Sequence, residues 1–385
     1  MTRKYIKIYG LLLGMLFGAG IFALPYVFSR AGLFWGFFHF LAAFFIIIYL
    51  HFWYAEISYF TKGKHRFTGY AEIFEGKKTK FLAFLSTLFS NYGSLLIYAI
   101  LGGIFFSNIS TYFSQSIATL LFFLLGGVLI WGSFEKVGVV NFYLTIPLFI
   151  FVVYLLIIAL PKINVDNFST GNILNGDWFL PYGVWIFALG CTNILPEVRE
   201  VIGEMDIKKF KKIIFTSILL TSFFYFLFIF SVWGTSGIFT TEDSLSGMIN
   251  ILGKTSLIIG SVIGLLAVFT SYVAMAIDMK YVFNYDYKIN SFLSWVLTAM
   301  PPVVLYLLGV QNFVKTISII GAVGMGIFGI FVLMIRHNME KQFLKGKREN
   351  LIYTERGFIK RNYLLEIIVL FGLLAGVIFE LLKVL

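Results

Sequence analysis

Two apolar stretches of the chain combine glycines with a proline in a way that would break a membrane-spanning helix. The first holds Gly18 and Gly20, and Pro25 follows Gly20 by five residues. The second holds Gly190, and Pro196 follows it by six residues. Inside a helix, glycine costs about 1 kcal/mol and proline about 3 kcal/mol. We therefore expect both stretches to unwind near the middle of the membrane, where the freed backbone groups could bind a small polar molecule.

The two breaks also match each other in position. The second lies in the sixth predicted span, which crosses the membrane in the opposite direction to the first. Broken helices at matching positions of two inverted halves are typical of a transporter site. The alternative is that the glycines only let neighbouring helices pack closely. The transporter interpretation predicts that Gly18, Gly20 and Gly190 have non-helical backbone and face one shared cavity.

Groups that could catalyse a reaction are scarce inside the apolar stretches. The chain has no HExxH, no Gly-x-Ser-x-Gly and no Walker sequence, which argues against a membrane protease and an ATP-driven pump. Acidic residues fall near the predicted span ends, namely Glu56, Asp278, Glu366 and Glu380. A membrane-embedded enzyme would need convergent acids, bases or nucleophiles, and a passive channel would need polar faces on several spans. Neither pattern is evident, and both stay as alternatives.

Four other ionisable residues have more than one interpretation. His39 and His51 fall in the second predicted span, where a packed or interfacial role is expected in preference to a proton relay. Glu197 and Arg199 lie at the inner end of the sixth span. They could form an inner gate with a charged partner, or they could simply be a solvated helix end.

The composition and the apolar stretches predict the membrane-spanning helices that would hold these residues. Of the 385 residues, 59% are hydrophobic and only 13% are charged, whereas a soluble domain has roughly 25% charged residues. A spanning helix needs about 20 apolar residues. The sequence predicts eleven such spans, near residues 6–29, 33–60, 81–107, 117–133, 138–160, 180–203, 212–234, 255–282, 291–309, 315–336 and 362–384. The boundary between the fourth and fifth spans is the least defined.

The basic residues predict the orientation of these spans. With the N-terminus inside, 25 of the 30 lysines and arginines face the cytoplasm. The other five are Arg30, Lys162, Lys254, Lys315 and Lys383. This asymmetry follows the positive-inside rule, so the net charge of +11 is a topology signal and no nucleic-acid partner is expected. The inner loop 61–80 mixes aromatic and basic residues, which predicts a short amphipathic helix lying on the inner leaflet.

One motif resembles a known family. The run from Gly18 to Pro25, GAGIFALP, is similar to the first-helix signature of the amino acid/polyamine/organocation (APC) superfamily. The pair Pro196-Glu197, together with eleven spans and an inside N-terminus, resembles its amino acid/auxin permease and aromatic amino acid permease branches. The resemblance covers spans one to ten.

The resemblance implies an all-α membrane protein with the LeuT-type fold. In that fold two inverted repeats of five helices, with helices one and six broken, would form a single transporter domain over residues 1–385. The first repeat would cover residues 1–160 and the second residues 161–336. Residues 337–385 would form a cytoplasmic loop and an extra eleventh helix.

The resemblance also implies a substrate site at the two breaks. Backbone N–H groups of Ala19, Gly20 and Ile21 would bind a carboxylate, which suits the positive end of a helix dipole. Carbonyls near Phe187 to Leu189 would accept an ammonium group. The expected substrate-binding residues are Gly18, Ala19, Gly20, Ile21, Phe187, Ala188, Leu189, Gly190, Cys191, Thr192, Asn91 and Tyr92.

A second site is implied in the eighth span. In sodium-coupled members of the LeuT fold, an alanine carbonyl and a Thr-Ser pair bind Na⁺ together with two carbonyls of the first helix. The matching positions here are Ala267, Thr270 and Ser271, with Gly14 and Phe17. The alternative is that both hydroxyls bond back to their own helix. Some proton-coupled relatives place a lysine of span five there, and the span from Val139 to Leu160 has none.

These interpretations together predict a secondary active transporter. It would move a small amino acid by alternating access, coupled to Na⁺ or H⁺, with no other cofactor. Spans one, two, six and seven would rock against spans three, four, eight and nine. The expected location is the inner membrane, with the N-terminus inside and the C-terminus outside. The particular amino acid, the coupling ion and the oligomeric state stay open.

Overall fold

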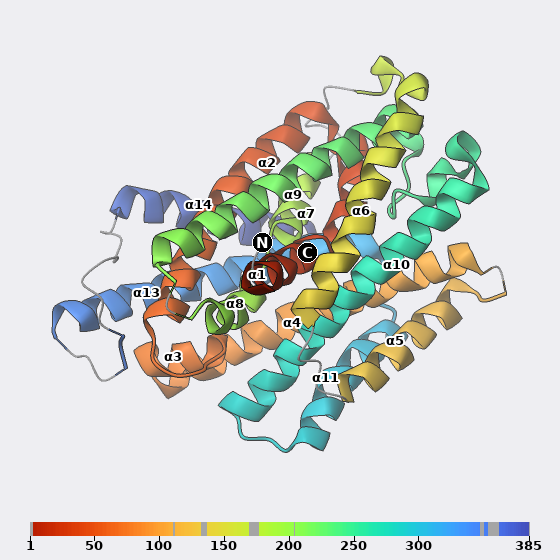
Figure 1. The fold of residues 1–385 in the computed structure, drawn as a ribbon. Coiled ribbons are helices and arrows are strands. Elements are labelled where there is room, and N and C mark those ends of the chain that lie inside the picture. The colour runs from red at the N-terminus through yellow and green to blue at the C-terminus, as the bar shows by residue number, and fades with distance from the viewer. Residues whose placement is uncertain are drawn as a thin grey trace.

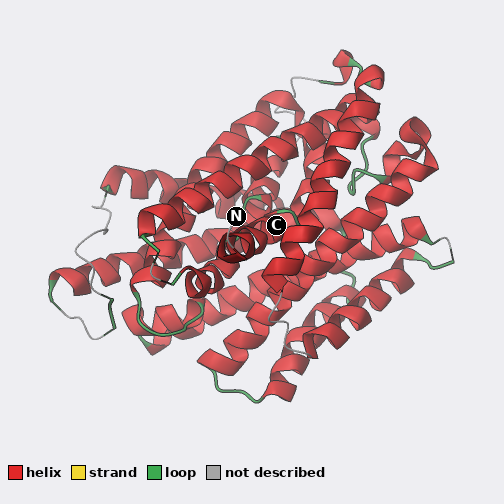
Figure 2. Ribbon diagram, in the orientation of Figure 1, coloured by secondary structure: helices red, strands yellow, loops and turns green. Residues whose placement is uncertain are grey.

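The fold is built from helices throughout the part of the chain that the structure describes. A computed structural model describes residues 3–110, 112–131, 137–168, 177–203, 205–346, 350–352 and 362–384. Within these ranges the structure has no strand, only one isolated bridge between Thr61 and Leu351 (Figure 2). Six of the basic residues that set the predicted orientation, Lys136 and five between 347 and 361, lie outside the described residues. The boundary between the fourth and fifth spans also falls outside them, at 132–136.

A described helix lies at every predicted span. The α-helices, most of which are labelled in Figure 1, are α1 (Arg3–Leu16), α2 (Gly20–Phe60), α3 (Phe67–Glu75), α4 (Lys77–Ile109), α5 (Gln115–Trp131), α6 (Val137–Ala159), α7 (Leu180–Ala188), α8 (Leu195–Ile202), α9 (Ile207–Ser236), α10 (Ile249–Tyr281), α11 (Ser291–Leu307), α12 (Phe313–Ile319), α13 (Met325–Leu344) and α14 (Tyr363–Val384). Three short stretches matter for the site: the 3₁₀ turn η4 (Thr192–Ile194) and the π-helical stretches η7 (Val282–Asp286) and η8 (Ile320–Gly324).

Length and apolarity show that the helices suit a membrane. Among the described residues, seven helical stretches are long and apolar enough to span one, and α5 and α11 are shorter apolar helices. The stretch Arg3–Phe60 holds two predicted spans, and the chain turns between them at Gly32, whose φ of 83° favours glycine. Large apolar side chains on the outside, such as Leu124 and Phe371, are 63% and 73% exposed. Such exposure suits contact with lipid rather than with water.

Both predicted breaks are present. Helix α1 ends at Leu16 and α2 begins at Gly20, so residues 17–19 are outside any helix. Helix α7 ends at Ala188, and residues 189–191 lead through η4 into α8. The prediction of a non-helical backbone is confirmed for Gly18 and Gly190 and is wrong for Gly20, which is the first helical residue of α2. The prediction of one shared cavity is confirmed for Gly190 but not for Gly18 or Gly20, which do not line the cavity beside the second break.

The long helices pack around these breaks. Helix α2 packs against α7 and α9, α1 against α6, and α4 against α10, so the two broken segments lie between longer continuous helices (Figure 1). Helix α7 also approaches η8 closely. A Cβ at Gly321 would lie only 1.9 Å from the carbonyl oxygen of Gly183, so no larger residue fits at this crossing.

The loop 61–80 contains the predicted short helix, but in an environment that differs from the expected one. Helix α3 buries Phe67, Tyr70 and Phe74 against the protein. The rings of Phe67 and Phe328 are 4.3 Å apart, and Tyr54 meets Tyr70 at 5.9 Å. The expectation that this apolar face lies on the inner leaflet is therefore wrong, because α2 and α13 cover it.

Candidate substrate site

Side chains of neighbouring helices pair with three of the backbone groups at the two breaks. The hydroxyl of Tyr225, in α9, lies within hydrogen-bond distance of the carbonyl oxygen of Leu16 and, at 3.0 Å, of that of Ala188. These carbonyls end α1 and α7, so one buried hydroxyl joins both breaks. On the other side of the second break, the backbone N–H of Cys191 donates to Nε2 of His51 at 2.9 Å. His51 donates in turn from Nδ1 to the carbonyl of Ile47, at 2.7 Å.

The two breaks also touch each other directly. A Cβ added at Gly20 would lie 2.5 Å from Cα of Ala188, which is closer than real Cβ atoms come. At Gly18 the added atom would lie 3.0 Å from the Tyr98 ring and 3.1 Å from Oγ of Ser271. Gly20 therefore serves the close approach of α2 to α7. This contact explains why it is a glycine although its backbone is helical.

A cavity lies beside the second break and the start of η4. Its empty volume, which includes space open to solvent, is about 750 Å³. Helices α1, α4, α7, α10 and α13 all contribute to its wall. The lining includes Met15, Gly190 and Cys191 at the breaks and reaches Arg66 and Asp278.

The cavity brings together some of the predicted substrate residues but not others. Those that line it are Asn91, Phe187, Gly190, Cys191 and Thr192. Those that do not line it are Gly18, Ala19, Gly20, Ile21, Ala188, Leu189 and Tyr92. Gly18 contacts the cavity residue Tyr98 from behind. The hydroxyl of Tyr92 donates to the carbonyl of Leu297 at 2.6 Å, towards α11, which favours a packing role.

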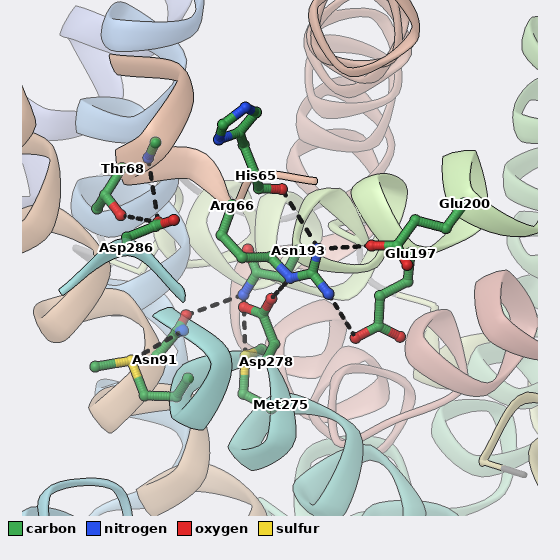
Figure 3. A network of polar contacts seen from close by, with 12 residues as sticks. His65, Arg66, Thr68, Asn91, Asn193, Glu197, Glu200, Met275, Asp278 and Asp286 are labelled. Carbon is green, nitrogen blue, oxygen red and sulfur yellow. Dashed lines mark hydrogen bonds and ion pairs between the residues drawn. The ribbon is translucent and has the colours of Figure 1, made fainter. Parts of the chain in front are cut away.

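Polar contacts connect α4, η4 and α10 in the cavity wall. The side-chain amide of Asn193 donates to Oδ1 of Asn91 at 2.9 Å and lies 2.9 Å from Sδ of Met275. The amide of Asn91 lies 3.4 Å from Sδ of Met279. Figure 3 shows Asn91, Asn193 and Met275 beside Asp278 and Arg66.

Arg66 occupies the centre of a charged cluster that joins the loop before α3 to α8 and α10. Its guanidinium lies 3.3 Å from Asp278, 3.2 Å from Glu200 and 3.7 Å from Glu197 (Figure 3). Burial alone would lower the pKa of Arg66, but the carboxylates of Asp278, Glu197 and Glu200 outweigh burial and raise it above its ordinary value. Arg66 therefore stays charged and holds α8 against α10.

Asp286, at the end of η7, anchors the start of α3. Its carboxylate accepts hydrogen bonds from the hydroxyl of Thr68 and from the backbone N–H of Gly69, the latter at 3.1 Å. A carboxylate at a helix N-terminus also interacts favourably with the helix dipole. This segment is thus fixed to α10 by Arg66 itself and to η7 by the residues that follow it.

The other ionisable residues of uncertain role are engaged in packing. Arg199 stacks over the ring of Tyr59 at 4.7 Å and donates to the carbonyl of Gly203 at 2.7 Å, whereas Glu197 belongs to the Arg66 cluster. His39 lies among aromatic rings, with Phe179 at 5.1 Å.

A second buried ionic network lies between α2, α9, α13 and α14. Glu56, which has no exposed surface, pairs with Lys211 and with Arg336, the latter at 2.8 Å. Arg336 also pairs with Glu366 at 2.9 Å. The network ties α9, α13 and α14 to α2, the helix that follows the first break.

The predicted ion-binding residues also lie together. Gly14, Phe17, Ala267 and Thr270 line one small cavity, with Thr145 of α6 on its far wall. Oγ of Ser271 donates to the carbonyl of Gly14 at 2.9 Å and is also 3.1 Å from that of Ala267, while the hydroxyl of Thr270 bonds back to Ala267 at 3.0 Å. The hydroxyls therefore show the helix back-bonding of the alternative interpretation and, at Ser271, a contact to α1.

The donors of this second site are all uncharged oxygens. Such ligands suit hard cations, and no lysine is among the described residues that line the cavity. Elsewhere in the described ranges, no group of three or more His, Cys, Asp or Glu could hold a metal ion.

Sequence reasoning missed several residues of the site. Arg66 is one of several basic residues in the loop 61–80, and Asn193 follows Thr192 in an apolar stretch, so neither has a distinctive local pattern. Tyr225 was one aromatic among the 21 tyrosines and 46 phenylalanines of the chain. The only signal for Arg66 was the presence of Asp278 near the end of an apolar stretch, where a buried acid needs a partner.

Comparisons with known proteins agree on a transporter. The model of a family described as the tryptophan/tyrosine permease family matches residues 1–377. The crystal structure of MhsT in complex with L-phenylalanine is similar at 13% identity and a TM-score of 0.70, over 99% of this chain and 97% of that chain. Mhp1, a nucleobase-cation-symport-1 family transporter with bromovinylhydantoin bound, is similar at 14% identity and a TM-score of 0.68, over 97% and 90%. These structural likenesses show the LeuT fold. No curated protein sequence matches the chain.

Proposed function

The chain belongs to the tryptophan/tyrosine permease family, and from this premise we propose that it carries an aromatic amino acid across the membrane. It is a multi-pass integral membrane protein and a secondary transporter, not an enzyme. The family description names tryptophan and tyrosine, so the proposed substrate is larger than the small amino acid that the sequence analysis expects.

The observation that carries this proposal is the cavity between a broken helix and an aromatic wall. Gly190 and Cys191 line it where α7 ends, and Tyr98, Phe187 and Phe328 supply rings. Backbone groups at the breaks suit the charged ends of an amino acid, since an N-terminal helix end attracts a carboxylate and freed carbonyls accept an ammonium group. The aromatic side chains suit a flat apolar side chain. We keep Ala19, Gly20 and Ile21 as the proposed carboxylate donors; they do not line the cavity in this structure, so binding the carboxylate would require the first break to rearrange.

The finer details of the architecture belong to the same proposal. We place the chain in the APC superfamily, near the amino acid/auxin and aromatic amino acid permeases, on the GAGIFALP run and the Pro196-Glu197 pair. Residues 1–160 and 161–336 would be the two inverted repeats, and α14 would be the eleventh span. The asymmetry of basic residues supports an N-terminus inside and a C-terminus outside, in an inner membrane.

On this orientation the structure is closed on the outer side of the breaks. The ring of Phe22 meets that of Phe105 at 4.8 Å and that of Phe228 at 5.7 Å. On the inner side, the Arg66 cluster bridges α8, which follows the second break, and α10. Opening towards the cytoplasm would require α8 to leave α10, and a substrate that prefers one arrangement would shift the populations.

For the coupling ion we propose Na⁺ bound between α1 and α10, with H⁺ as the alternative. The convergence of Gly14, Phe17, Ala267 and Thr270 on one small cavity supports Na⁺. Replacing both Thr270 and Ser271 with alanine should abolish the Na⁺ dependence of uptake while leaving the protein folded. Uptake by the unmodified protein that follows a pH gradient and ignores Na⁺ would overturn the sodium proposal and leave the amino acid proposal intact.

The substrate is tested by uptake into proteoliposomes. Labelled tryptophan, tyrosine, phenylalanine, leucine and alanine are offered separately, each with and without a Na⁺ gradient. Accumulation of the aromatic amino acids, inhibited by unlabelled tryptophan, is the expected result. Accumulation of alanine or leucine with no aromatic uptake would contradict the proposed substrate class.

A further inference from the structure

One side of the substrate cavity is polar although most of its wall is apolar. The apolar part includes Tyr98, Phe187, Ile320, Met325 and Phe328. The polar part follows one face of α4, where Ser86, Ser90 and Ser94 recur every four residues and Asn91 lies beside them. Residues four apart share a helix face, so the stripe is a continuous feature of this helix.

Asn193 adds an uncommitted acceptor to this polar side. Its amide nitrogen already has two neighbours, Oδ1 of Asn91 at 2.9 Å and Sδ of Met275 at 2.9 Å. Among the residues that the structure describes, the side-chain carbonyl oxygen of Asn193 has only the hydroxyl of Thr192 as a donor, at the long distance of 3.5 Å. A side-chain carbonyl has two lone pairs, so the Asn193 oxygen can still accept a strong hydrogen bond.

Two hydroxyls of α4 provide an independent observation. Oγ of Ser86 and Oγ of Ser90 are buried and have no hydrogen-bond partner within the described ranges. Both residues line the cavity, and Ser86 is only 7% exposed. By contrast, the hydroxyl of Ser94 bonds to the carbonyl of Ser90 at 2.7 Å. Buried hydroxyls are normally satisfied, so the two free ones point to a ligand that brings its own polar group.

We propose that Ser86, Ser90, Asn91 and Asn193, the polar side of the cavity, recognise a hydrogen-bond donor on the substrate's ring. The indole N–H of tryptophan and the phenol O–H of tyrosine both carry such a donor. Asn193 is the accepting residue, Asn91 holds its amide in place, and the serine hydroxyls are available to donate to the phenol oxygen of tyrosine. These residues therefore select tryptophan and tyrosine over phenylalanine. This inference rests on the proposed function, because it assumes an aromatic amino acid in this cavity.

The surroundings of the polar side fit a flat ring. Met275 lies next to Asn193, and Met325 lines the same cavity. Thioether sulfurs make favourable contacts with aromatic rings and adapt to their shape. A ring can therefore pack among methionines while its polar atom reaches Asn193. Phenylalanine lacks a ring donor and leaves the side-chain carbonyl of Asn193 unpaired, which a site built for hydrogen bonding penalises.

The first test uses the unmodified protein. Uptake of labelled tryptophan is competed by unlabelled tryptophan, tyrosine, phenylalanine and 3-benzothienylalanine, in which sulfur replaces the indole N–H at nearly constant shape. The expected result is that phenylalanine and benzothienylalanine compete at least about tenfold more weakly than tryptophan. Equal competition by benzothienylalanine and tryptophan would overturn the inference.

Two variants then locate the effect. Asn193→Leu keeps the volume and removes the acceptor, and Ser90→Ala removes one free hydroxyl without touching the Asn91 contact. Asn193→Leu should raise the KM for tryptophan and tyrosine about tenfold or more while that for phenylalanine changes little. Ser90→Ala should also raise the KM for tryptophan and tyrosine relative to the KM for phenylalanine, but by a smaller factor. Ser107→Ala is the matched control, because that serine of α4 bonds to Ile104 and does not line the cavity.

The outcomes separate the inference from the proposed function. If the unmodified protein takes up no aromatic amino acid, the proposed function fails. If the unmodified protein takes up aromatic amino acids but Asn193→Leu raises the KM for tryptophan, tyrosine and phenylalanine by the same factor, the inference fails and the proposed function stands. Should Asn193→Leu not fold, the benzothienylalanine competition and Ser90→Ala still decide the matter.

Discussion

Replacing Tyr225 with phenylalanine tests how the two breaks are held together. The hydroxyl of Tyr225 lies between the carbonyls that end α1 and α7, those of Leu16 and Ala188. The ring is fully buried and meets Phe17 edge-on at 5.5 Å. Phenylalanine keeps these ring contacts, so the variant removes only the hydroxyl.

The expected cost follows from the groups left unpaired. A buried acceptor that loses its donor costs about 1–3 kcal/mol, and the single hydroxyl hydrogen satisfies the two carbonyls between them. The variant should therefore lose about 1–3 kcal/mol of stability in the absence of substrate. Because Ala188 is one of the carbonyls proposed to accept the substrate's ammonium group, saturating tryptophan should recover part of that loss.

The measurement is thermal unfolding of the purified protein in detergent, with and without tryptophan. Tyr9→Phe is the control, since the Tyr9 hydroxyl has only a part-buried contact with Thr216 at 3.4 Å between the same two helices, α1 and α9. If Tyr225→Phe and Tyr9→Phe lose the same amount of thermal stability, the hydroxyl of Tyr225 does not hold the breaks together. An equal loss in stability with and without tryptophan would show that the ammonium group does not reach this carbonyl.

Two further variants probe the packing around the site. Glu56→Gln should destabilise the protein by about 3–5 kcal/mol, because it leaves two buried cations with one carboxylate fewer. Lys64→Gln, whose side chain is 72% exposed, should cost about 0–1 kcal/mol in the same unfolding assay, and equal effects would contradict the burial argument. Gly20→Ala should abolish uptake, since the new methyl group would meet the backbone of Ala188 at 2.5 Å. Gly18→Ala should retain more activity because it meets mainly side-chain atoms, at 3.0 Å or more, and the reverse order of activities would refute this account.

The local features of the fold could be predicted from the sequence. Long apolar stretches predict the helices. The combination of Gly18 with Pro25 predicts the first break, and that of Gly190 with Pro196 predicts the second. These signals depend on residues close together in the chain. The exception is Gly20, which is a glycine because Ala188 lies against it, and the sequence does not reveal which residue packs there.

The site depends on contacts between distant residues, and much of it could not be predicted. Arg66 is separated from its partner Asp278 by more than 200 residues, so its charge suggested a solvated inner loop instead of a buried cluster. Tyr225 has no local signature, because its role comes only from the two carbonyls it meets. The residues proposed to bind the ion do have a local signal, because the spacing from Ala267 to Ser271 resembles a known pattern.

Labelling of Cys191 tests the central claim, that the substrate binds at the broken helices, most directly. Cys191 is the single cysteine of the chain and lines the cavity beside Gly190. A small membrane-permeant thiol reagent should react with it, and saturating tryptophan should slow that reaction because the substrate would cover the thiol. Alanine at the same concentration provides the control for non-specific effects. A labelling rate that is the same with and without tryptophan, under conditions where tryptophan is transported, would contradict a substrate site at these breaks.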